Sequence, residues 1–351
     1  MVDYIVVGLG LAGISFCEQL EKNGKTFRVI SDDSQTSSVV AGGMYNPVIL
    51  KRFTLAWNAK DQLEKAMPFY NLLEEKLKIK VDTKVAVQRR FASIEEQNMW
   101  FEASDKPKLN SFLSTNIIKN INKAIDADFG YGEVLGTGRI DTEKLIVTYT
   151  NYLLSKEAFK KETFAFDDLK VEDDCVVYKE LKARHIVFAT GYGLKENPYF
   201  SYLPLNGTKG ELLTIKAPNL KEENVIKSSV FIIPLSDNLY RIGATYKWKD
   251  KTNVPTQESK EELINKLKSF LNCDYEIVSH VAGIRPTVAD RRPLVGTHPL
   301  HSRLHVLNGF GSRGVMIAPT ASETLFNAIE NDEPVDSEMD IARFTKKYFN
   351  K

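Results

Sequence analysis

The 351-residue sequence predicts an α/β fold made of a discontinuous domain and an α+β domain inserted into it. Strands and helices alternate near both ends of the chain, which is typical of a parallel sheet covered by helices. The middle of the chain carries short apolar runs separated by turn residues, which are typical of antiparallel strands. A chain of 351 residues also favours about two domains.

The chain begins with a strand, a glycine-rich turn and a helix. Gly8, Gly10 and Gly13 form a G-x-G-x-x-G turn. The flanking apolar patterns predict a strand over 3–7, a helix over 14–23 and a second strand over 27–30. In this context the turn is typical of a dinucleotide-binding βαβ unit, whereas the same spacing alone carries little information.

Each glycine has its own physical role in such a turn. Gly8 permits the sharp exit from the strand, Gly10 lets the main chain approach a pyrophosphate, and Gly13 lets the helix pack close to the sheet. The N–H groups at the start of the helix, at Leu11 and Ala12, meet the phosphates at the positive end of the helix dipole. These five residues are therefore predicted to bind a dinucleotide.

The ribose contact has two candidates. The acidic residue that usually closes the second strand is expected at position 31, but Ser31 stands there and Asp32 and Asp33 follow it. We expect either the Ser31 hydroxyl or Asp32 to hold the ribose. The alternative is that both aspartates are solvated turn residues.

Composition excludes several classes of function. The sequence has 47 basic and 46 acidic residues, a net charge of +1, so no overall field attracts nucleic acid or an anionic membrane. Its 3 cysteines form no C-x-x-C pair, which argues against a structural metal and for a reducing compartment. No apolar run approaches the roughly 20 residues that span a bilayer, and the first strand begins too early for a signal peptide. We expect a cytoplasmic protein with no metal and no membrane partner.

Helices and strands alternate over the next part of the chain. The apolar spacing predicts helices over 57–80, 94–104 and 141–156, the last of them capped by Asp141. A cluster of glycines over 129–138 predicts a loop. Short strands are predicted over 176–178 and 185–189, and the second is apolar enough to be central in a sheet.

The pattern changes beyond residue 206. Antiparallel strands are predicted over 211–215, 229–234 and 240–246, the last two joined by a turn at 236–238. A helix over 256–271 follows, and the tail returns to a strand at 304–307, a glycine loop and a helix. The predicted nucleotide-binding domain therefore comprises 1–80, 130–205 and 280–351, and the inserted substrate domain comprises 81–129 and 206–279.

Two further segments favour a flavin over a nicotinamide dinucleotide. One apolar strand ends in small residues that let the backbone pass close to a bound nucleotide. A second run of small residues, just after the second strand, can lie along the pyrophosphate and one edge of a flat ring. The predicted contacts are Ala189, Thr190 and Gly191 in the first segment, and Ser38, Gly42, Gly43 and Met44 in the second.

A third segment near the C-terminus combines a strand, a glycine-rich turn and a helix start. A helix N-terminus aimed at the pyrimidine edge of a flavin stabilises the negative charge that develops there on reduction. An ordinary βα turn is the alternative. The predicted contacts are Gly311, Ser312, Arg313, Gly314, Val315 and Met316. The three segments together, in this order, predict FAD.

With these motifs the chain resembles the D-amino-acid oxidase and glycine oxidase family of FAD-dependent oxidoreductases. The resemblance runs nearly end to end, through the stretches 8–13, 41–44, 189–191, 242–245, 283–286, 290–296 and 309–319. It implies a discontinuous Rossmann-like FAD domain and a second domain whose mixed, largely antiparallel sheet roofs the flavin. It also implies oxidation of a C–N bond of a small amino acid or carboxylated amine by hydride transfer to flavin N5.

The resemblance also assigns roles to two residues. In this family the arginine of a Gly-x-Arg-Pro motif pairs with the substrate carboxylate, and Arg285 stands in that place. A rigid fork of donors suits a carboxylate, and the alternative is a structural ion pair beneath the flavin. Tyr246 is the candidate pocket wall, with a core tyrosine as its alternative. The histidine or cysteine that holds flavin covalently in some relatives has no counterpart here, so FAD is expected to be noncovalent.

The segment 47–52 instead looks similar to the FAD domain of the tRNA wobble-uridine modification enzyme, which removes a carboxymethyl group from an amine. Lys51 and Arg52 then lie at the mouth of the active site, or are simply solvated. The near-neutral charge does not favour nucleic acid as a partner, and no methyltransferase-like segment is recognised. A small carboxylated amine is therefore the first hypothesis and a tRNA-bound carboxymethylamine the second, while the C-terminal glycine loop argues against an NAD-linked dehydrogenase.

Overall fold

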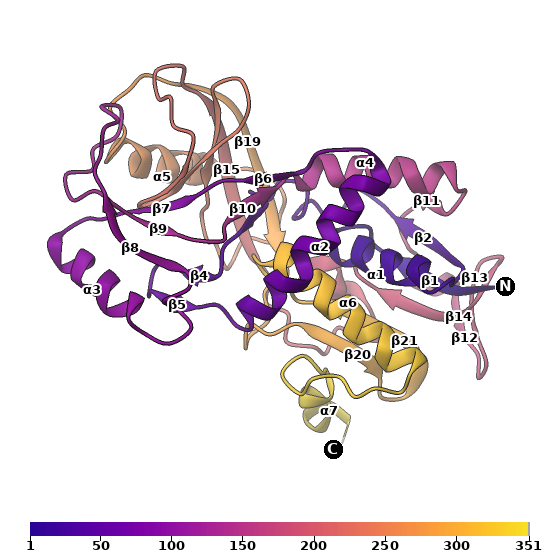
Figure 1. The fold of residues 1–351 in the computed structure, drawn as a ribbon. Coiled ribbons are helices and arrows are strands. Elements are labelled where there is room, and N and C mark those ends of the chain that lie inside the picture. Colours follow the sequence, from indigo (N-terminus) through magenta and orange to yellow (C-terminus); the bar gives the residue numbers. More distant parts are fainter. Residues whose placement is uncertain (350–351) are drawn as a thin grey trace.

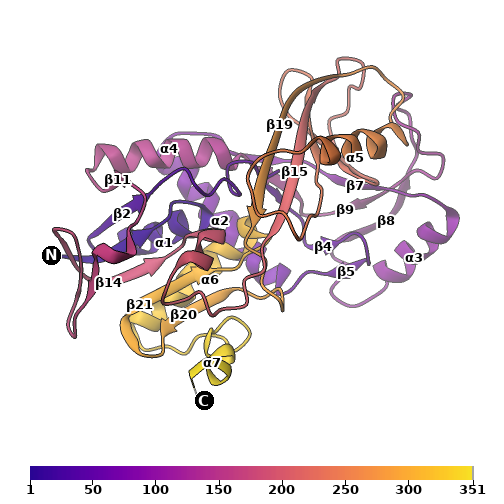
Figure 2. The same cartoon turned by 180° about the vertical axis from the view of Figure 1, so that it is seen from behind.

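The computed structural model describes residues 1–349 and contains two large sheets, one in each half of the molecule. Figure 1 shows the two halves side by side, with the N- and C-termini both in the half that holds α1, α2, α4 and α6. The other half carries α3 and α5. Seen from behind, the long strands β15 and β19 run at the junction between the halves (Figure 2).

The first sheet is built on four parallel strands in the order β2, β1, β14 and β21, with β11 parallel at one edge. Antiparallel strands β12, β13 and β20 complete it. The bounds are β1 Val2–Val7, β2 Phe27–Ser31, β11 Phe159–Lys161, β12 Leu169–Val171, β13 Val176–Tyr178, β14 Leu181–Phe188, β20 Leu294–His298 and β21 His301–Asn308. Because the parallel strands share one direction, their carboxyl ends meet at one edge, where doubly wound folds bind their ligands.

Helices cover one face of this sheet because alternate side chains of its strands point to opposite faces. Tyr4 and Val6 of β1 pack in a core cluster with residues of α1, α2, α4 and α6, whereas Ile5 and Val7 belong to the cluster on the other face. The helices are α1 Leu11–Lys22, α2 Ala59–Leu77, α4 Thr142–Ser155, α6 Gly314–Glu330 and the C-terminal α7 Ala342–Phe349. Asp141 caps α4 by accepting the Lys144 N–H, as predicted.

The second sheet has the strand order β19-β15-β18-β17-β16-β7-β9-β8. Its neighbours are antiparallel except for the parallel pair β16 and β7, so the sheet is mixed, as the family resemblance implies. The bounds are β7 Val87–Arg90, β8 Leu113–Ile118, β9 Tyr131–Val134, β15 Thr208–Lys216, β16 Val225–Lys227, β17 Phe231–Pro234, β18 Leu239–Gly243 and β19 Glu276–Arg285. The helices of this half are α3 Ile94–Ser104 and α5 Gln257–Lys268.

One face of the second sheet is covered by α5, and the opposite face looks toward the first half. Leu213, Ile215 and Ile242 pack with Leu263 and Leu267 of α5 in one apolar cluster. The alternate residues of the same strands, among them Leu212 and Gly243, therefore face away from α5. These residues line the cavity described below.

The predicted turn between β17 and β18 is a tight hairpin. Asp237 and Asn238 have φ angles of 58° and 60°, and the Leu239 N–H donates to the Ser236 carbonyl. Two successive residues with positive φ match the type I′ turn, whose twist suits a two-residue hairpin loop. The strand after the turn is shorter than predicted, since β18 ends at Gly243 and Tyr246 lies beyond it.

The predicted loop over 129–138 is wrong, because this segment contains strand β9 and the start of β10. Gly132 lies inside β9, where a Cβ would come within 2.6 Å of the Phe91 ring and as close to the Trp100 ring. Aromatic rings packed against β9 require glycine at position 132. The sequence prediction had taken this glycine as a sign of a loop. The remaining strands are β3 Met44–Tyr45, β4 Val48–Ile49, β5 Thr54–Leu55, β6 Asp82–Lys84 and β10 Gly138–Ile140.

The division of the chain into domains stays a prediction. Strand β9 pairs with β7 and β8, and β19 pairs with β15 along its whole length, so both strands lie in the second sheet. This pairing favours boundaries after β9 and after β19, slightly beyond the predicted positions at 130 and 280. Within residues 1–349, no helix is long and apolar enough to cross a bilayer.

Candidate active site

A cavity of about 1240 Å³ lies at the carboxyl ends of β1, β2 and β14 and extends to the face of the second sheet that is free of α5. Nearly all of the predicted site residues line it. They are Gly8, Gly10, Leu11, Ala12, Ser31, Asp32, Ser38, Gly42, Gly43, Met44, Ala189, Thr190, Gly191, Tyr246, Arg285, Gly311, Ser312, Arg313, Gly314, Val315 and Met316. Gly13 is absent from this lining.

Two positions of the glycine turn, Gly8 and Gly13, leave no room for a side chain. Gly8 has a φ of 96°, and a Cβ there would lie 2.6 Å from the Ala189 carbonyl oxygen, so both conformation and packing require glycine. A Cβ on Gly13 would overlap the Gly8 carbonyl, which explains why this glycine serves helix packing and not the cavity wall. Gly10 is the N-cap of α1 and has no side-chain cap, so the first N–H groups of the helix remain available.

Ser31 and Asp32 lie at the end of β2, beside this turn. The Ser31 hydroxyl accepts the Leu9 N–H at 3.2 Å, which ties the glycine turn to the second strand. Asp32 accepts from the Ser34 N–H and hydroxyl at 3.1 and 2.6 Å. Burial opposes ionisation of Asp32, but the hydrogen bonds from Ser34 prevail and lower the pKa of its carboxyl. Both residues line the cavity, and the ribose contact stays a prediction with these two candidates.

The small-residue segment after β2 runs between the two halves. A Cβ on Gly10 would meet the Ser38 hydroxyl at 3.1 Å, so Ser38 faces the glycine turn. Gly42 lies against Ile233 of β17, where an added Cβ would be 2.8 Å from its side chain. Gly43 has a φ of 67° and accepts the Ile140 N–H at 2.9 Å. This segment therefore forms a wall of the cavity with little side-chain volume.

The strand end of β14 and the N-terminus of α6 complete the nucleotide side. The Thr190 hydroxyl is buried and has no hydrogen-bond partner within residues 1–349. A Cβ on Gly314 would meet Leu11 at 3.1 Å, so the N-termini of α6 and α1 lie side by side. Two helix N-termini and an unpaired hydroxyl form a donor set that suits the phosphates and polar edge of FAD. The residues present thus fit the predicted cofactor.

Arg285 and Tyr246 meet on the opposite wall. The Arg285 guanidinium lies over the Tyr246 ring, with 4.4 Å from its carbon to the ring centre. Its Nη1 donates to the Thr245 carbonyl at 3.3 Å, and Thr245 is itself buried and paired with Glu211. Burial lowers the pKa of Arg285, and Tyr246 opposes that shift. Tyr246 is 61% exposed, so it is not a core tyrosine.

Gly210 is a site residue that sequence reasoning missed. It lies on β15 beside β19, and a Cβ there would overlap the Arg285 guanidinium. The strand was predicted over 211–215, so Gly210 stood just before it, whereas β15 begins at Thr208 and contains Gly210. A glycine inside a strand often marks a close approach of another group to the backbone. Gly210 therefore provides the space in which the guanidinium lies.

Arg291 and Arg292 are adjacent in the sequence but lie in different environments. Arg291 is exposed and lines the cavity. Arg292 pairs with Glu338 at 2.9 Å and belongs to the fold of the C-terminal segment. Lys51 and Arg52, predicted at the mouth or in solvent, are exposed and also line the cavity.

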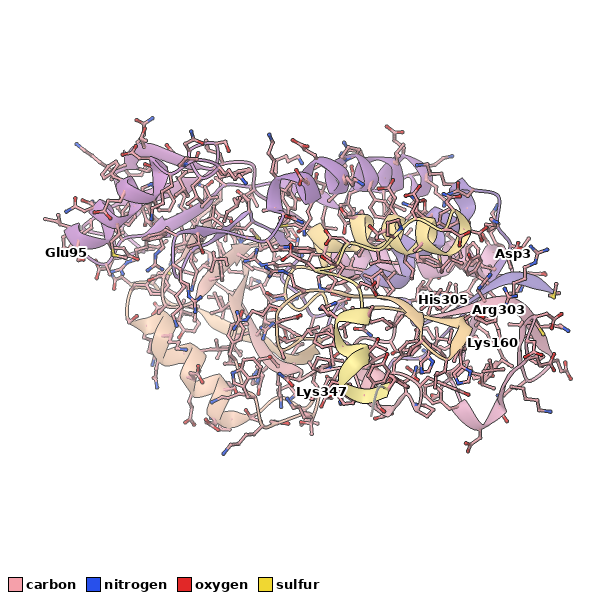
Figure 3. The ribbon with its side chains drawn as sticks, turned by 90° about the horizontal axis from the view of Figure 1, so that it is seen from below. Asp3, Glu95, Lys160, Arg303, His305 and Lys347 are labelled. Atoms are coloured by element: carbon pink, nitrogen blue, oxygen red, sulfur yellow. The ribbon has the colours of Figure 1, made fainter. Side chains whose placement is uncertain are left out.

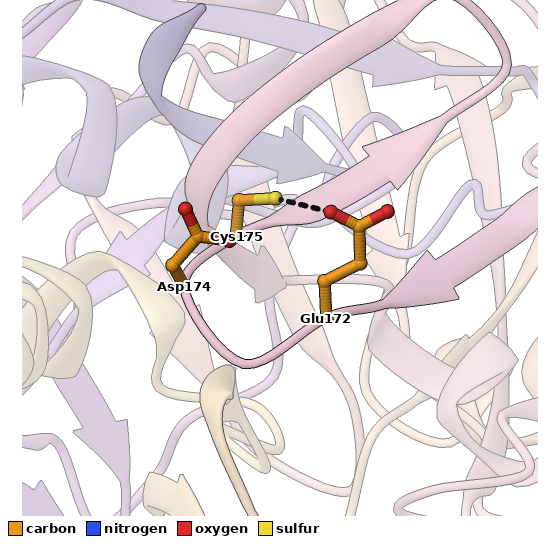
Figure 4. Close-up of side chains that lie close together, drawn as sticks. All are labelled: Glu172, Asp174 and Cys175. Atoms are coloured by element: carbon orange, nitrogen blue, oxygen red, sulfur yellow. Dashed lines mark hydrogen bonds between the residues drawn. The ribbon is translucent and has the colours of Figure 1, made fainter.

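A group of potential metal ligands lies elsewhere, in the β12–β13 hairpin (Figure 4). Within residues 1–349, Glu172, Asp174 and Cys175 are the group whose ligand atoms lie within 4.8 Å of one another. The Cys175 thiol donates to Glu172 at 3.0 Å, and this hydrogen bond raises the pKa of the thiol. A protonated thiol is a poor metal ligand, so the hairpin hydrogen bond accounts for this arrangement.

A parallel sheet with glycine-lined strand ends faces a second sheet whose Arg285 forms no ion pair among residues 1–349, an arrangement typical of a dinucleotide-dependent oxidoreductase. The chain belongs to the family of FAD dependent oxidoreductases, whose family model matches residues 3–327. It is therefore an FAD-dependent enzyme.

Two curated proteins represent its relatives. A glycine oxidase from Bacillus subtilis is 27% identical over 158 residues, which cover 43% of this chain and 42% of that enzyme. The tRNA 5-methylaminomethyl-2-thiouridine biosynthesis bifunctional protein MnmC from Nitrosospira multiformis is 24% identical over 351 residues, which cover 91% of this chain and 55% of that protein. The matches span 42% and 55% of these relatives' own lengths.

Solved structures share the fold over nearly the whole chain. A glycine oxidase from Bacillus cereus has a TM-score of 0.78 at 17% identity and covers 95% of this chain and 96% of that one. An iminodiacetate oxidase from Chelativorans has a TM-score of 0.76 at 16% identity, with the same coverage of 95% and 96%. At these identities the similarity concerns the fold.

Proposed function

We infer that this protein oxidises a C–N bond of a small amino acid or carboxylated amine. The observation that carries the proposal is the environment of Arg285. Among residues 1–349, its guanidinium forms no ion pair with a carboxylate, and its polar contacts are the Thr245 carbonyl and the Tyr246 ring. A half-buried guanidinium that lines a cavity without a counter-ion is a ready receptor for a ligand carboxylate.

The alternative role of Arg285, a structural ion pair, is not favoured by these contacts. Its protein hydrogen bond is to the neutral Thr245 carbonyl, which leaves most of the five N–H donors of the guanidinium free. The Tyr246 ring stacks on one face of the guanidinium and limits its rotation. The fork is therefore held in one orientation toward the cavity before a ligand binds.

The remaining walls are suited to excluding water from a reacting C–N bond. The face of the second sheet toward the cavity presents the apolar residues Leu212 and Phe231. FAD, when bound, supplies the acceptor for the hydride, and the glycine turn, Thr190 and the start of α6 are the residues we assign to hold it. Arg285 orients the amine through its carboxylate, and a neutral amine needs no general base from the protein.

Anaerobic flavin reduction tests the proposal. Purified protein is mixed without oxygen with glycine, sarcosine, proline and D-amino acids, and the bleaching of the oxidised flavin band is followed. We expect at least one carboxylated amine to bleach the flavin, and the matching decarboxylated amine to be far slower. Acid precipitation should release the flavin from the chain, since its attachment is proposed to be noncovalent. No bleaching by any carboxylated amine would contradict the proposal.

A second candidate is removal of a carboxymethyl group from a tRNA-bound amine. Two observations favour it: the match to the bifunctional tRNA-modification protein covers 91% of this chain, and the cavity lining is rich in cations. Those cations include Lys51, Arg52, Lys227, Lys266 and Arg291. Phosphate contacts would make binding fall steeply with salt. Mass spectrometry of tRNA nucleosides after incubation with the enzyme separates the candidates, because the small-amine proposal expects unchanged tRNA.

A further inference from the structure

The segment 244–256 joins β18 to α5 and forms part of the cavity wall. Its side chains Tyr246 and Trp248 line the cavity, and both are exposed. Two contacts attach Arg285 to this segment, because the Thr245 carbonyl accepts a hydrogen bond from its guanidinium and the Tyr246 ring packs against it. The position of segment 244–256 therefore determines where the guanidinium lies.

A buried lysine holds this segment from the far face of β15. Lys209 precedes Gly210 on β15, and alternate residues of a strand point to opposite faces, so the Lys209 side chain points away from the cavity. It has no exposed surface, and its ammonium donates to the Asp250 carboxylate at 2.5 Å, to the Thr252 hydroxyl at 3.3 Å and to the Val254 carbonyl. An ammonium has three N–H donors, so the full hydrogen-bonding capacity of Lys209 serves residues 250–254.

The charges around Lys209 indicate what this arrangement contributes. Its ammonium also lies 3.5 Å from the carboxylate of Glu211, which has no exposed surface and accepts from the N–H and hydroxyl of Thr256 at 2.7 and 2.9 Å. The hydrogen bond from Lys209 lowers the pKa of Asp250 to about 2, so this pair is ionised at neutral pH. Desolvation offsets much of the attraction within a buried ion cluster, but the cluster still favours one arrangement of the groups that it joins.

We propose that Lys209 and Asp250 are positioning residues for the substrate carboxylate, acting through segment 244–256 on the orientation of Arg285. Neither residue lines the cavity, so neither touches the ligand. Their ion pair holds the segment where its two contacts with the guanidinium form. The inference rests on the proposed function, because it takes Arg285 as the receptor for that carboxylate. An arginine that is oriented before binding loses less conformational entropy when the ligand arrives.

Asp250→Asn tests this role in the holoenzyme, because it breaks the ion pair while Glu211 still balances the buried charge of Lys209. The matched control is Glu258→Gln, which removes a partner of Lys247 in the same segment from a pair in which the Glu258 side chain is 79% exposed. Exposed ion pairs contribute little. We expect the Kd of glycolate, read from the flavin spectral shift, and the KM of a carboxylated amine to rise about 10-fold in Asp250→Asn, with kcat changed less than about twofold. The control should change none of these values.

The direction of the change separates orientation from charge. Removing a negative charge near a cationic site strengthens carboxylate binding by charge alone, so weaker binding in Asp250→Asn reports a displaced guanidinium. Hydrogen exchange of the 244–256 amides gives a second readout, which should be faster in Asp250→Asn and slowed by glycolate. Faster exchange with unchanged glycolate affinity would overturn the proposal, and so would unchanged exchange or equal losses in the control. Wild type that neither binds glycolate nor is reduced by any carboxylated amine would refute the proposed function as well as this role.

Discussion

The Arg285 guanidinium lies over the Tyr246 ring, with its central carbon 4.4 Å from the ring centre, at the cavity wall formed by the second sheet. The aromatic face stabilises the cation without neutralising it, so the guanidinium keeps its full charge for a ligand. The Thr245 carbonyl fixes one edge of the fork at 3.3 Å. Arg285 is therefore a cation held in one orientation, and the exposed Tyr246 ring packs against it.

Replacing Arg285 should separate substrate binding from flavin binding. Arg285→Ala removes the partner of a buried substrate carboxylate, which costs on the order of 2–5 kcal/mol. We expect kcat/KM to fall by roughly two to three decades with an unchanged flavin spectrum. Arg285→Lys should recover part of the loss, since an ammonium lacks the bidentate fork. If wild type and Arg285→Ala bind glycolate equally well in a spectral titration, Arg285 is structural.

Gly210→Ala should reproduce much of this effect without removing a charge. The added methyl would overlap the Arg285 guanidinium and displace it from the Tyr246 ring. We expect KM for a carboxylated amine to rise by about 10- to 100-fold, with flavin content retained. The double variant Gly210→Ala/Arg285→Ala should be no worse than Arg285→Ala, because the two changes act on one interaction. Additive losses in this cycle would show that Gly210 acts elsewhere.

The nucleotide side of the fold was predictable because its constraints are local. Gly8 has a positive φ, and Gly13 lets α1 pack against the glycine turn. Such constraints recur at fixed sequence spacing and can therefore be recognised without the structure. Gly132 shows the opposite case, because its constraint comes from Trp100 and Phe91, which lie far away in the sequence. A glycine that serves a distant ring looks like a loop residue until the fold is known.

The substrate side was only partly predictable for the same reason. Arg285 was found through a motif. Gly210 contacts it from the neighbouring strand β15, although the two residues are 75 positions apart in the sequence (285 − 210 = 75). Long-range pairing of β15 with β19 creates this site, and no local pattern encodes that register.

Gly10 tests the assignment of the pyrophosphate. In Gly10→Val the branched side chain would fill the space beside the free N–H groups of α1, so the purified protein should contain almost no FAD. Gly10→Ala is the graded control, because its Cβ meets only the Ser38 hydroxyl at 3.1 Å, at the end of a small side chain that can move. Flavin content is read from absorbance after acid release. Stoichiometric FAD in Gly10→Val would mean that the turn is misassigned.

A pair of histidines, the half-buried His185 and the buried His305, links two strands of the nucleotide sheet. His185 of β14 and His305 of β21 approach at 3.0 Å between ring nitrogens, and Thr297 contacts the far side of His305 at 2.9 Å. Figure 3 labels His305 and Arg303 at the end of the molecule opposite Glu95 of α3. Burial lowers the pKa of His185 to about 4, helped by Arg303 and opposed by Glu330. Burial and the His185 charge lower the pKa of His305 as well.

This pair should make the protein less stable in mild acid. Below about pH 6.5 the unfolded chain binds protons that the folded protein excludes, so stability falls as the pH drops toward 4 and carries no such cost above 6.5. Arg184 and Lys25 also face His185 and act in the same direction as Arg303. Between pH 7 and pH 5 we expect His185 to lower the free energy of unfolding by about 1–2 kcal/mol, measured by urea denaturation. His185→Gln should be less stable at pH 7 but show a shallower decline with falling pH. An identical pH dependence in wild type and variant would mean that His185 has the same pKa in the folded and unfolded protein.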